Sequence, residues 1–441
     1  MKRLPCTNRR CATGSVQHPS ASEGRRGGLK VPHFRDEHRL FAMRSATPLL
    51  LSLLALLPTT AAMATGLTGA IQTFERLSFQ IDREREGFVR RARQQLTGGD
   101  ALSTLSPSSY ALKPGSAVCI TGANDGIGRA AAVYLAKQGY ATVLCARTQA
   151  KADEAVAYVQ AAASGAQSAG AVIDLASFES VARGGDAIRA AAADLDAPLR
   201  GLLLNAGVWP TERRISADGL EEGIQVCHVS HFMLTQDLLP DLSEGGEEAR
   251  VVTVSSSAHA LAPGVDLSDQ TWSKRTFDAT TAYGESKLAN LLFAEELASR
   301  APSMVDGGRI TSLALHPGVV ATSLFKEFTP QQSGTSLPTP PPQLETLLET
   351  IASSPPAKLA FKLPEDGCRT SCYALLAPGL PTGAYLSDCE LTDVSPAAKD
   401  VKARRELWEW TEEWVAARRA ELGEAAARRA ELAMREAAAG E

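Results

Sequence analysis

Short apolar runs alternate with alanine-rich stretches between Lys113 and about Glu390, and this alternation limits the possible folds of the chain most strongly. The runs expected to form strands are "AVCI" (117–120), "YATVLCA" (140–146), "AVID" (171–174), "GLLLN" (201–205), "RVVTVS" (250–255), "ITSLALH" (310–316) and "GAYLS" (383–387). Continuously apolar strands that alternate with helices are typical of a parallel sheet covered on both faces. The sequence therefore predicts an α/β fold with a doubly wound, Rossmann-like parallel sheet, whose ligands bind at the carboxyl ends of the strands.

The first predicted strand runs into "TGANDGIG" (121–128), which places Gly122, Gly126 and Gly128 before a helix-like stretch. Glycines let the backbone turn tightly, and the amides of a helix N-terminus attract a pyrophosphate. The spacing is G-x-x-x-G-x-G rather than the G-x-G-x-x-G of the dinucleotide fingerprint. Packing can also require glycines, but their position between a strand and a helix favours a nucleotide site.

The end of the second predicted strand indicates which nucleotide is bound. In NAD sites, an acidic residue about 20 positions after the glycines holds the ribose 2′-hydroxyl. Here the strand ends in Arg147, and a guanidinium can bind a 2′-phosphate through two hydrogen bonds. We therefore predict NADP(H) as the cofactor, although Asp125 inside the glycine loop is awkwardly placed for a 2′-phosphate.

A tyrosine and a lysine four residues apart form the candidate catalytic pair. Tyr283 and Lys287 lie in "AYGESKLAN" (282–290), where one helical turn places both side chains on the same face. A neighbouring ammonium stabilises a phenolate, so we expect the pKa of Tyr283 to be lowered toward neutrality. The pair alone is a weak motif, because chance supplies it often.

The ordered set of motifs is specific where the single motifs are not. With "LLLNAG" (202–207), "VVTVSSSAH" (251–259) and "HPGVVAT" (316–322), the chain resembles the short-chain dehydrogenase/reductase family, in the branch of the retinol dehydrogenases and protochlorophyllide reductases. The resemblance covers about residues 113 to 415. It implies hydride transfer between a nicotinamide and a carbonyl or alcohol group, with no metal ion.

The resemblance also implies a role for particular residues. Ser256, the middle of three serines, would hold the substrate oxygen, Tyr283 would transfer the proton, and Lys287 would bind the ribose hydroxyls while tuning Tyr283. The implied cofactor contacts are Gly122, Gly126, Ile127 and Gly128 at the pyrophosphate, Arg147 at the 2′-phosphate, Asp174 and Leu175 at the adenine, Asn205, Ala206 and Gly207 after the fourth strand, and Pro317, Gly318 and Thr322 at the nicotinamide.

One residue departs from the family pattern. Cys227 occupies a position where the family usually has an asparagine, which is thought to hold a water that connects the lysine to solvent. A thiol forms only weak hydrogen bonds, so the proton relay is expected to be slower or to follow another route. A buried structural thiol is favoured over a reactive nucleophile.

The substrate is expected to be lipophilic, because Leu347, Leu348 and Ile351 lie in a lid-like segment after a proline-rich loop, within 324–363. Packing of a helix on the core explains these residues equally well. One alternative function is a C=C reductase like protochlorophyllide reductase, although those enzymes typically carry cysteine where this chain has Val319. Another is a weakly catalytic NADP-binding scaffold or sensor, which the intact Ser256, Tyr283 and Lys287 disfavour.

Composition excludes some other classes. A net charge of −5 argues against nucleic-acid binding, which usually needs a basic surface. The eight cysteines are not spaced as in zinc fingers, and several lie inside apolar runs, so they are expected to be reduced core residues. Cys368 and Cys372 lie one helical turn apart without nearby histidines and form a poor metal site.

The chain is expected to divide into four parts: a targeting leader (1–66), a charged helix with a linker (67–112), a single catalytic domain (113–394) and a helical C-terminal extension (395–441). Residues 43–64 have a cationic start, a short apolar core and a small-residue end, as in a cleavable signal sequence. The stretch upstream of Met43 is either an untranslated leader wrongly included or part of an organelle-targeting extension. The leader thus indicates an organelle or endomembrane location, plastid or endoplasmic reticulum.

The two flanking helices are expected to differ in their packing. Phe74, Leu77, Ile81 and Phe88 fall roughly on one side of the first helix, which can dock on the domain or lie on a membrane surface; docking is favoured. In the last helix, Leu407, Trp408 and Trp414 are candidate anchors, and the part beyond Val415 is expected to be solvated. Many relatives in the family associate through helices, so a homo-oligomer is possible, but no sequence feature locates an interface.

Overall fold

The computed structural model describes residues 67–97, 99–305, 309–320 and 362–439. The predicted leader, Thr322 and almost all of the predicted lid lie outside these residues. Within the described ranges, no helix combines the length and the hydropathy needed to cross a bilayer.

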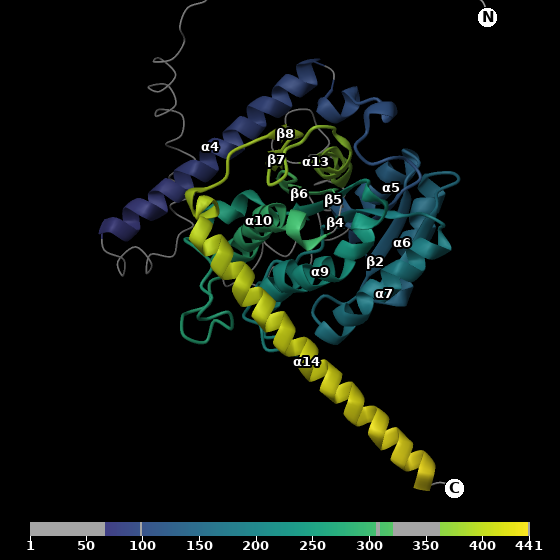
Figure 1. The fold of residues 1–441 in the computed structure, drawn as a ribbon. Coiled ribbons are helices and arrows are strands. Elements are labelled where there is room, and N and C mark those ends of the chain that lie inside the picture. The colour runs from purple at the N-terminus through teal and green to yellow at the C-terminus, as the bar shows by residue number, and fades with distance from the viewer. Residues whose placement is uncertain (1–66, 98, 306–308, 321–361, 440–441) are drawn as a thin grey trace, which may run out of the picture. The chain divides into compact units, whose positions relative to one another are not determined.

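A β-sheet lies at the centre of the described structure (Figure 1). It has eight strands in the order β3-β2-β1-β4-β5-β6-β7-β8. The strands are β1 (Ala117–Thr121), β2 (Ala141–Ala146), β3 (Ser168–Val172), β4 (Leu199–Leu204), β5 (Glu248–Val254), β6 (Arg309–His316), β7 (Tyr385–Ser387) and β8 (Glu390–Leu391). Strands β1 to β7 pair in parallel, and β8 pairs antiparallel with β7. The doubly wound parallel sheet is thereby confirmed, and the chain order reverses between β1 and β4, where such sheets bind ligands.

Helices cover both faces of this sheet (Figure 1). The α-helices are α4 (Leu67–Thr97), α5 (Gly126–Lys137), α6 (Gln149–Ala162), α7 (Phe178–Asp194), α8 (Glu222–Ile224), α9 (Ser230–Ser243), α10 (Ala279–Met304), α13 (Pro364–Leu376) and α14 (Val401–Ala439). The short helices are η1 (Ala101–Thr104), η2 (Pro107–Ser109), η3 (Gln225–Val229), η4 (Glu244–Gly246), η5 (Ser257–Leu261) and η7 (Pro396–Lys399). Helices α5, α6 and α13 share one hydrophobic core with the sheet, and α7, α9 and α10 share the other.

Alternate residues of a strand enter the two cores, as the pleat of a sheet requires. In β1, Cys119 lies in the core on one face, while Val118 and Ile120 lie in the core on the other. The six cysteines of the described residues are free and buried, as expected. The third strand differs from its prediction, because it runs from Ser168 to Val172 rather than over 171–174. Its pairing with β2 starts at Thr142 and Ser168, whose hydroxyls form a 2.8 Å hydrogen bond. Strand β3 ends at Val172, two residues before Asp174.

Both flanking helices pack on this unit. Helix α14 buries Leu407 and Trp408, and the Trp414 ring lies 4.7 Å from that of Phe178, which confirms the predicted anchors. Helix α4 packs on η5, as the docking interpretation predicts. Of the predicted apolar face, Leu77 and Ile81 are half-buried, whereas Phe88 remains 43% exposed.

Candidate active site

The glycine loop between β1 and α5 adopts the turn that its sequence predicts. Gly122 and Gly126 have φ values of +64° and +54°, a left-handed conformation that residues with a Cβ rarely adopt. Asp125 caps α5, because its carboxylate accepts a hydrogen bond from the Gly126 N–H at 2.7 Å. The loop therefore presents bare backbone at the N-terminus of α5, beside the point where the strand order reverses.

Gly128 is required by close packing. A Cβ at this position would lie 2.3 Å from the carbonyl oxygen of Gly122 and 2.6 Å from Nδ2 of Asn205. Asn205 in turn donates from Nδ2 to the carbonyl oxygens of Thr121 (2.9 Å) and Gly122 (3.3 Å). The glycine loop and the end of β4 are thus locked together at the third glycine.

Thr121 and His231 complete this junction, and sequence reasoning missed both. The Thr121 hydroxyl accepts from the backbone N–H groups of Asn205 (2.9 Å) and Ala206 (3.0 Å). His231 donates from Nδ1 to the carbonyl oxygen of Cys227 (3.1 Å), so its Nε2 is free to accept from the Thr121 hydroxyl (2.9 Å). Burial lowers the pKa of His231 to about 4, so the ring stays neutral and keeps this tautomer. No motif around His231 indicated the contact.

Ser256, Tyr283 and Lys287 meet at the ends of β5 and α10. The Ser256 side chain lies near enough to Tyr283 to lower the pKa of its phenol, and the Lys287 ammonium lies 5.5 Å from the centroid of the Tyr283 ring. Lys287 also donates from Nζ to the carbonyl oxygen of Val254 at 3.2 Å, which holds it beneath the end of β5. The structure therefore brings together Tyr283 and Lys287, which form the sequence motif, and Ser256, which the family resemblance assigns to the same site.

The pKa of Tyr283 is raised, contrary to the expectation from its lysine neighbour. Burial raises it because the phenolate loses hydration, and the Cys227 thiol adds to this. The charge of Lys287 and the hydrogen bond from Ser256 lower it by less. In this state of the protein the phenol is protonated, which is the form that donates a proton.

Cys227 lies next to the lysine. It sits in η3, a π-helical turn before α9, and is fully buried; such turns occur frequently at functional sites. A Cβ on Gly207 would lie 3.1 Å from Nζ of Lys287 and 3.4 Å from Sγ of Cys227, so both atoms face the same glycine. The nearest acceptor recorded for the thiol, the Val208 carbonyl oxygen, is at 3.9 Å.

Trp209 covers Tyr283, the candidate catalytic tyrosine, and sequence reasoning did not single it out. Its ring centroid lies 4.0 Å from that of Tyr283, with 33° between the ring planes. Trp209 lies in the loop after β4, close behind the "NAG" motif of residues 205–207. This closeness to the motif is the only feature of the sequence that could have indicated a role for Trp209. Tyr283 is 6% exposed, and the indole therefore forms part of what shields the phenol from water.

The remaining predicted cofactor residues lie at the carboxyl ends of their strands. Arg147 is exposed directly after β2, and Asp174, after β3, accepts from the Ala176 N–H at 3.0 Å. Leu175 is buried beside it. Pro317 and Gly318 are buried after β6, where Gly318 has a φ of +92°.

Comparison with known proteins agrees with this geometry. The family model described as short chain dehydrogenase matches residues 116–333. Retinol dehydrogenase 12 of Homo sapiens is 35% identical over 299 residues, which cover 67% of this chain and 84% of that protein. Retinol dehydrogenase 14 of Mus musculus is 32% identical over 316 residues, or 68% of this chain and 86% of that protein.

A solved structure of an uncharacterised protein from Mycobacterium paratuberculosis superposes with a TM-score of 0.52 at 29% identity, over 71% of this chain and 97% of that one. The match in sequence thus extends to the arrangement of the sheet and its helices. The chain belongs to the short-chain dehydrogenase family, in its retinol dehydrogenase-like branch, and is an NAD(P)-dependent oxidoreductase.

Proposed function

We propose that the protein is an NADP(H)-dependent reductase or dehydrogenase that acts on a carbonyl or alcohol group of a lipophilic small molecule. The observation that carries the proposal is the meeting of Ser256, Tyr283 and Lys287 at one end of the sheet, beside the glycine loop. Support for a lipophilic substrate comes from the names of the retinol dehydrogenases that the chain matches.

The residues around the loop fit a dinucleotide. Gly122 and Gly126 leave the backbone of the turn bare, and the N-terminus of α5 favours an anion. Arg147 would hold a 2′-phosphate, Asp174 and Leu175 would flank the adenine, and Pro317 and Gly318 would contact the nicotinamide. When bound, that cofactor supplies or accepts the hydride.

In the direction of reduction, the protein's own residues would handle the proton. The Tyr283 hydroxyl donates its proton to the carbonyl oxygen as negative charge develops there, and Ser256 donates a hydrogen bond to the same oxygen. The charge of Lys287 then stabilises the tyrosinate. Burial of the pair strengthens both interactions because little water competes for them.

A substrate screen tests the proposal. Consumption of NADPH and NADH is measured with small aldehydes, aliphatic ketones and long apolar carbonyl compounds, and the reverse reaction with the matching alcohols. We expect turnover with NADPH and a preference for the apolar compounds. Absence of turnover with every compound and both cofactors would leave the scaffold alternative as the better explanation.

Arg147→Ala tests the cofactor preference. Loss of a bidentate contact to the 2′-phosphate should weaken NADPH binding roughly 10- to 100-fold, since charge-assisted hydrogen bonds contribute about 1.5–3 kcal/mol. NADH lacks the 2′-phosphate and should bind within about twofold of wild type. Titration calorimetry with both dinucleotides measures this, and Lys137→Ala, an exposed cation at the other end of α5, is the matched control. Equal losses for both cofactors would contradict the role of Arg147.

Trp209 is expected to bind the apolar part of the substrate, because its indole packs against the candidate catalytic phenol. Replacing it with alanine should raise KM for large apolar carbonyl compounds about 3- to 10-fold, as expected for loss of an aromatic contact, with little change for a small aldehyde. Trp209→Phe keeps a ring and should lie between the two. Equal KM changes for small and large substrates would show that the indole only supports Tyr283.

A further inference from the structure

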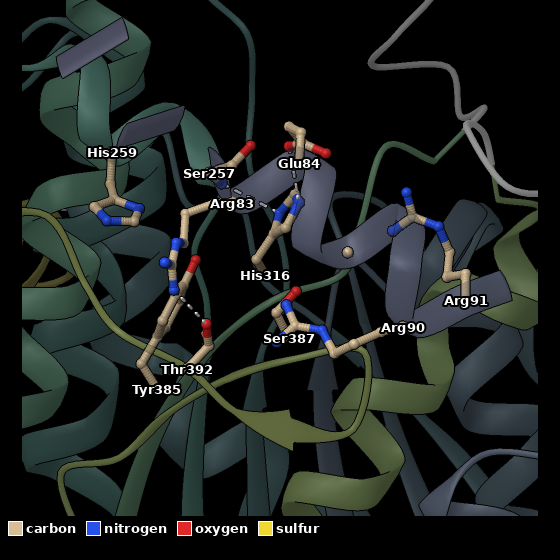
Figure 2. A pocket seen from close by; sticks show the side chains of 11 residues that line it. Arg83, Glu84, Arg90, Arg91, Ser257, His259, His316, Tyr385, Ser387 and Thr392 are labelled. Atoms are coloured by element: carbon tan, nitrogen blue, oxygen red, sulfur yellow. Dashed lines mark hydrogen bonds and ion pairs between the residues drawn. The ribbon is translucent and has the colours of Figure 1, made fainter. Parts of the chain in front are cut away.

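Helix α4 contacts the unit around the sheet partly through charged side chains. The residues of α4 that line the cavity beneath it are Arg83, Glu84, Gly87, Arg90 and Arg91 (Figure 2). The large apolar residues Phe88 and Val89 are instead 43% and 59% exposed. Charged side chains that are buried need compensating partners. The partners of the charged residues of α4 therefore show which parts of the protein the helix contacts.

One end of the docked face is fastened to a buried carboxylate. Asp388, just after β7, pairs with Arg91 at 3.2 Å and with Lys362 at 2.6 Å. The Cβ that Gly87 lacks would lie 3.1 Å from Oδ2 of Asp388, so the glycine allows the helix to approach closely. This contact holds α4 in place without touching the Ser256 turn.

Glu84 makes a different contact, which reaches the catalytic region (Figure 2). Its carboxylate lies 3.5 Å from Nε2 of His316, the last residue of β6. The Ser257 side chain is also near enough to lower the pKa of Glu84. His316 accepts the Ser257 backbone N–H at Nδ1, at 3.2 Å. One carboxylate therefore contacts both the residue after Ser256 and the residue before Pro317.

The hydrogen bonds assign the proton on the His316 ring. Because Nδ1 accepts from Ser257, the ring proton is on Nε2 and faces Glu84, and a carboxylate in this place fixes both the tautomer and the ring orientation. Burial raises the pKa of Glu84, but His316, Ser257 and Arg91 outweigh this and bring it to about 2. Glu84 is thus ionised at neutral pH and able to hold the imidazole.

The turn held in this way carries Ser256. Other bonds also restrain this turn: among them, the Ser255 hydroxyl donates to the Lys287 carbonyl oxygen at 2.7 Å, and His259 donates from Nδ1 to the Ser256 carbonyl oxygen at 2.6 Å. The Ser257 amide depends on His316, and His316 depends on Glu84. Glu84 lies upstream of residues 116–333, which the family model matches.

We propose that Glu84 is a positioning residue for the reaction: it orients His316, His316 holds the Ser257 amide, and helix α4 thereby fixes the turn that presents Ser256 to the substrate. The inference rests on the proposed function, because it assigns Ser256 to the substrate oxygen. In this proposal, α4 belongs to the active site.

Steady-state kinetics test the proposal. Glu84→Ala should lower kcat for carbonyl reduction about 10-fold or more, as removal of a partner that orients a site residue commonly does, while KM for NADPH stays within about twofold. Glu84→Gln keeps an oxygen that accepts from Nε2 of His316 and should restore most of kcat. The matched control is Glu86→Ala, on the same helix, which removes a 2.8 Å ion pair with Arg83 and should leave kcat unchanged. Equal kcat values for Glu84→Ala and Glu86→Ala would overturn the proposal.

Hydrogen exchange gives a readout that does not depend on activity. In Glu84→Ala without substrate, amides of 255–261 should exchange at least about 10-fold faster than in Glu86→Ala, while the amides of α4 keep their protection. Unchanged exchange of the turn, or loss of protection along the whole of α4, would overturn the positioning role. If the turn loosens but the wild type reduces no carbonyl compound, the proposed function has failed and the contact between Glu84 and the turn stands.

Discussion

Tyr283→Phe should lower kcat for carbonyl reduction by about 10²- to 10⁴-fold, the contribution typical of a positioned general acid. Phenylalanine keeps the ring that packs against Trp209 and removes only the hydroxyl, whose pKa Ser256 lowers. The fold and the cofactor site should therefore remain, and NADPH should bind within about threefold of wild type. The measurement is the single-turnover rate of NADPH oxidation with a carbonyl substrate that the wild type reduces.

A second tyrosine provides the control. Tyr158 on α6 is 46% exposed, and its ring lies under the guanidinium of Arg129, which phenylalanine can also accept. Tyr158→Phe should leave the rate unchanged. Similar single-turnover rates for wild type and Tyr283→Phe would refute proton transfer by Tyr283, whatever the steady-state values.

Gly128→Ala should destabilise the protein and weaken its cofactor binding together. The added Cβ would lie 2.3 Å from a backbone oxygen, so α5, the glycine loop or the end of β4 has to shift. Overpacking of this kind costs about 1–3 kcal/mol, and displacement of the loop should weaken NADPH binding at least about 10-fold. Denaturant unfolding and dinucleotide titration measure the two effects.

Gly423→Ala is the matched control for this substitution. Gly423 lies in α14 with no atom within 4 Å of its Cβ position, and alanine is favoured over glycine by roughly 0.8–1.0 kcal/mol within a helix. Its stability should be equal to or above that of wild type. If Gly128→Ala and Gly423→Ala behave alike, the close packing of the loop is not what requires the third glycine.

The sequence predicted most of what depends on local pattern. Alternation of apolar and alanine-rich stretches identified the parallel sheet, and the order of motifs identified the family. Each stretch and each motif consists of residues that are neighbours in the chain, so it can be read from the sequence. The strand at 171–174 was placed about three residues too late. Its small residues Ser168 and Gly170 carry little hydrophobic signal, and their pairing with β2 is decided across the sheet.

The sequence alone did not predict the contacts between segments that are far apart in the chain. The expected pKa of Tyr283 used one neighbour, Lys287, whereas the burial that reverses the shift comes from the whole fold. Trp209 and His231 belong to no motif. Their importance follows only from their contacts in the folded protein, Trp209 with Tyr283 and His231 with Thr121. On α4, apolar spacing did not predict the contacts of Glu84 and Arg91, because their partners His316 and Asp388 lie far away in the chain.

The sequence by itself determined the sheet, the bare glycine turn and the one-turn spacing of Tyr283 and Lys287, since periodicity and backbone sterics act over a few residues. Tertiary structure alone decided that Glu84 reaches His316, 232 positions away, and that Gly128 has no room for a methyl group. Those outcomes depend on which surfaces meet, and the free energies of burial and of ion pairing have no local signature in the chain.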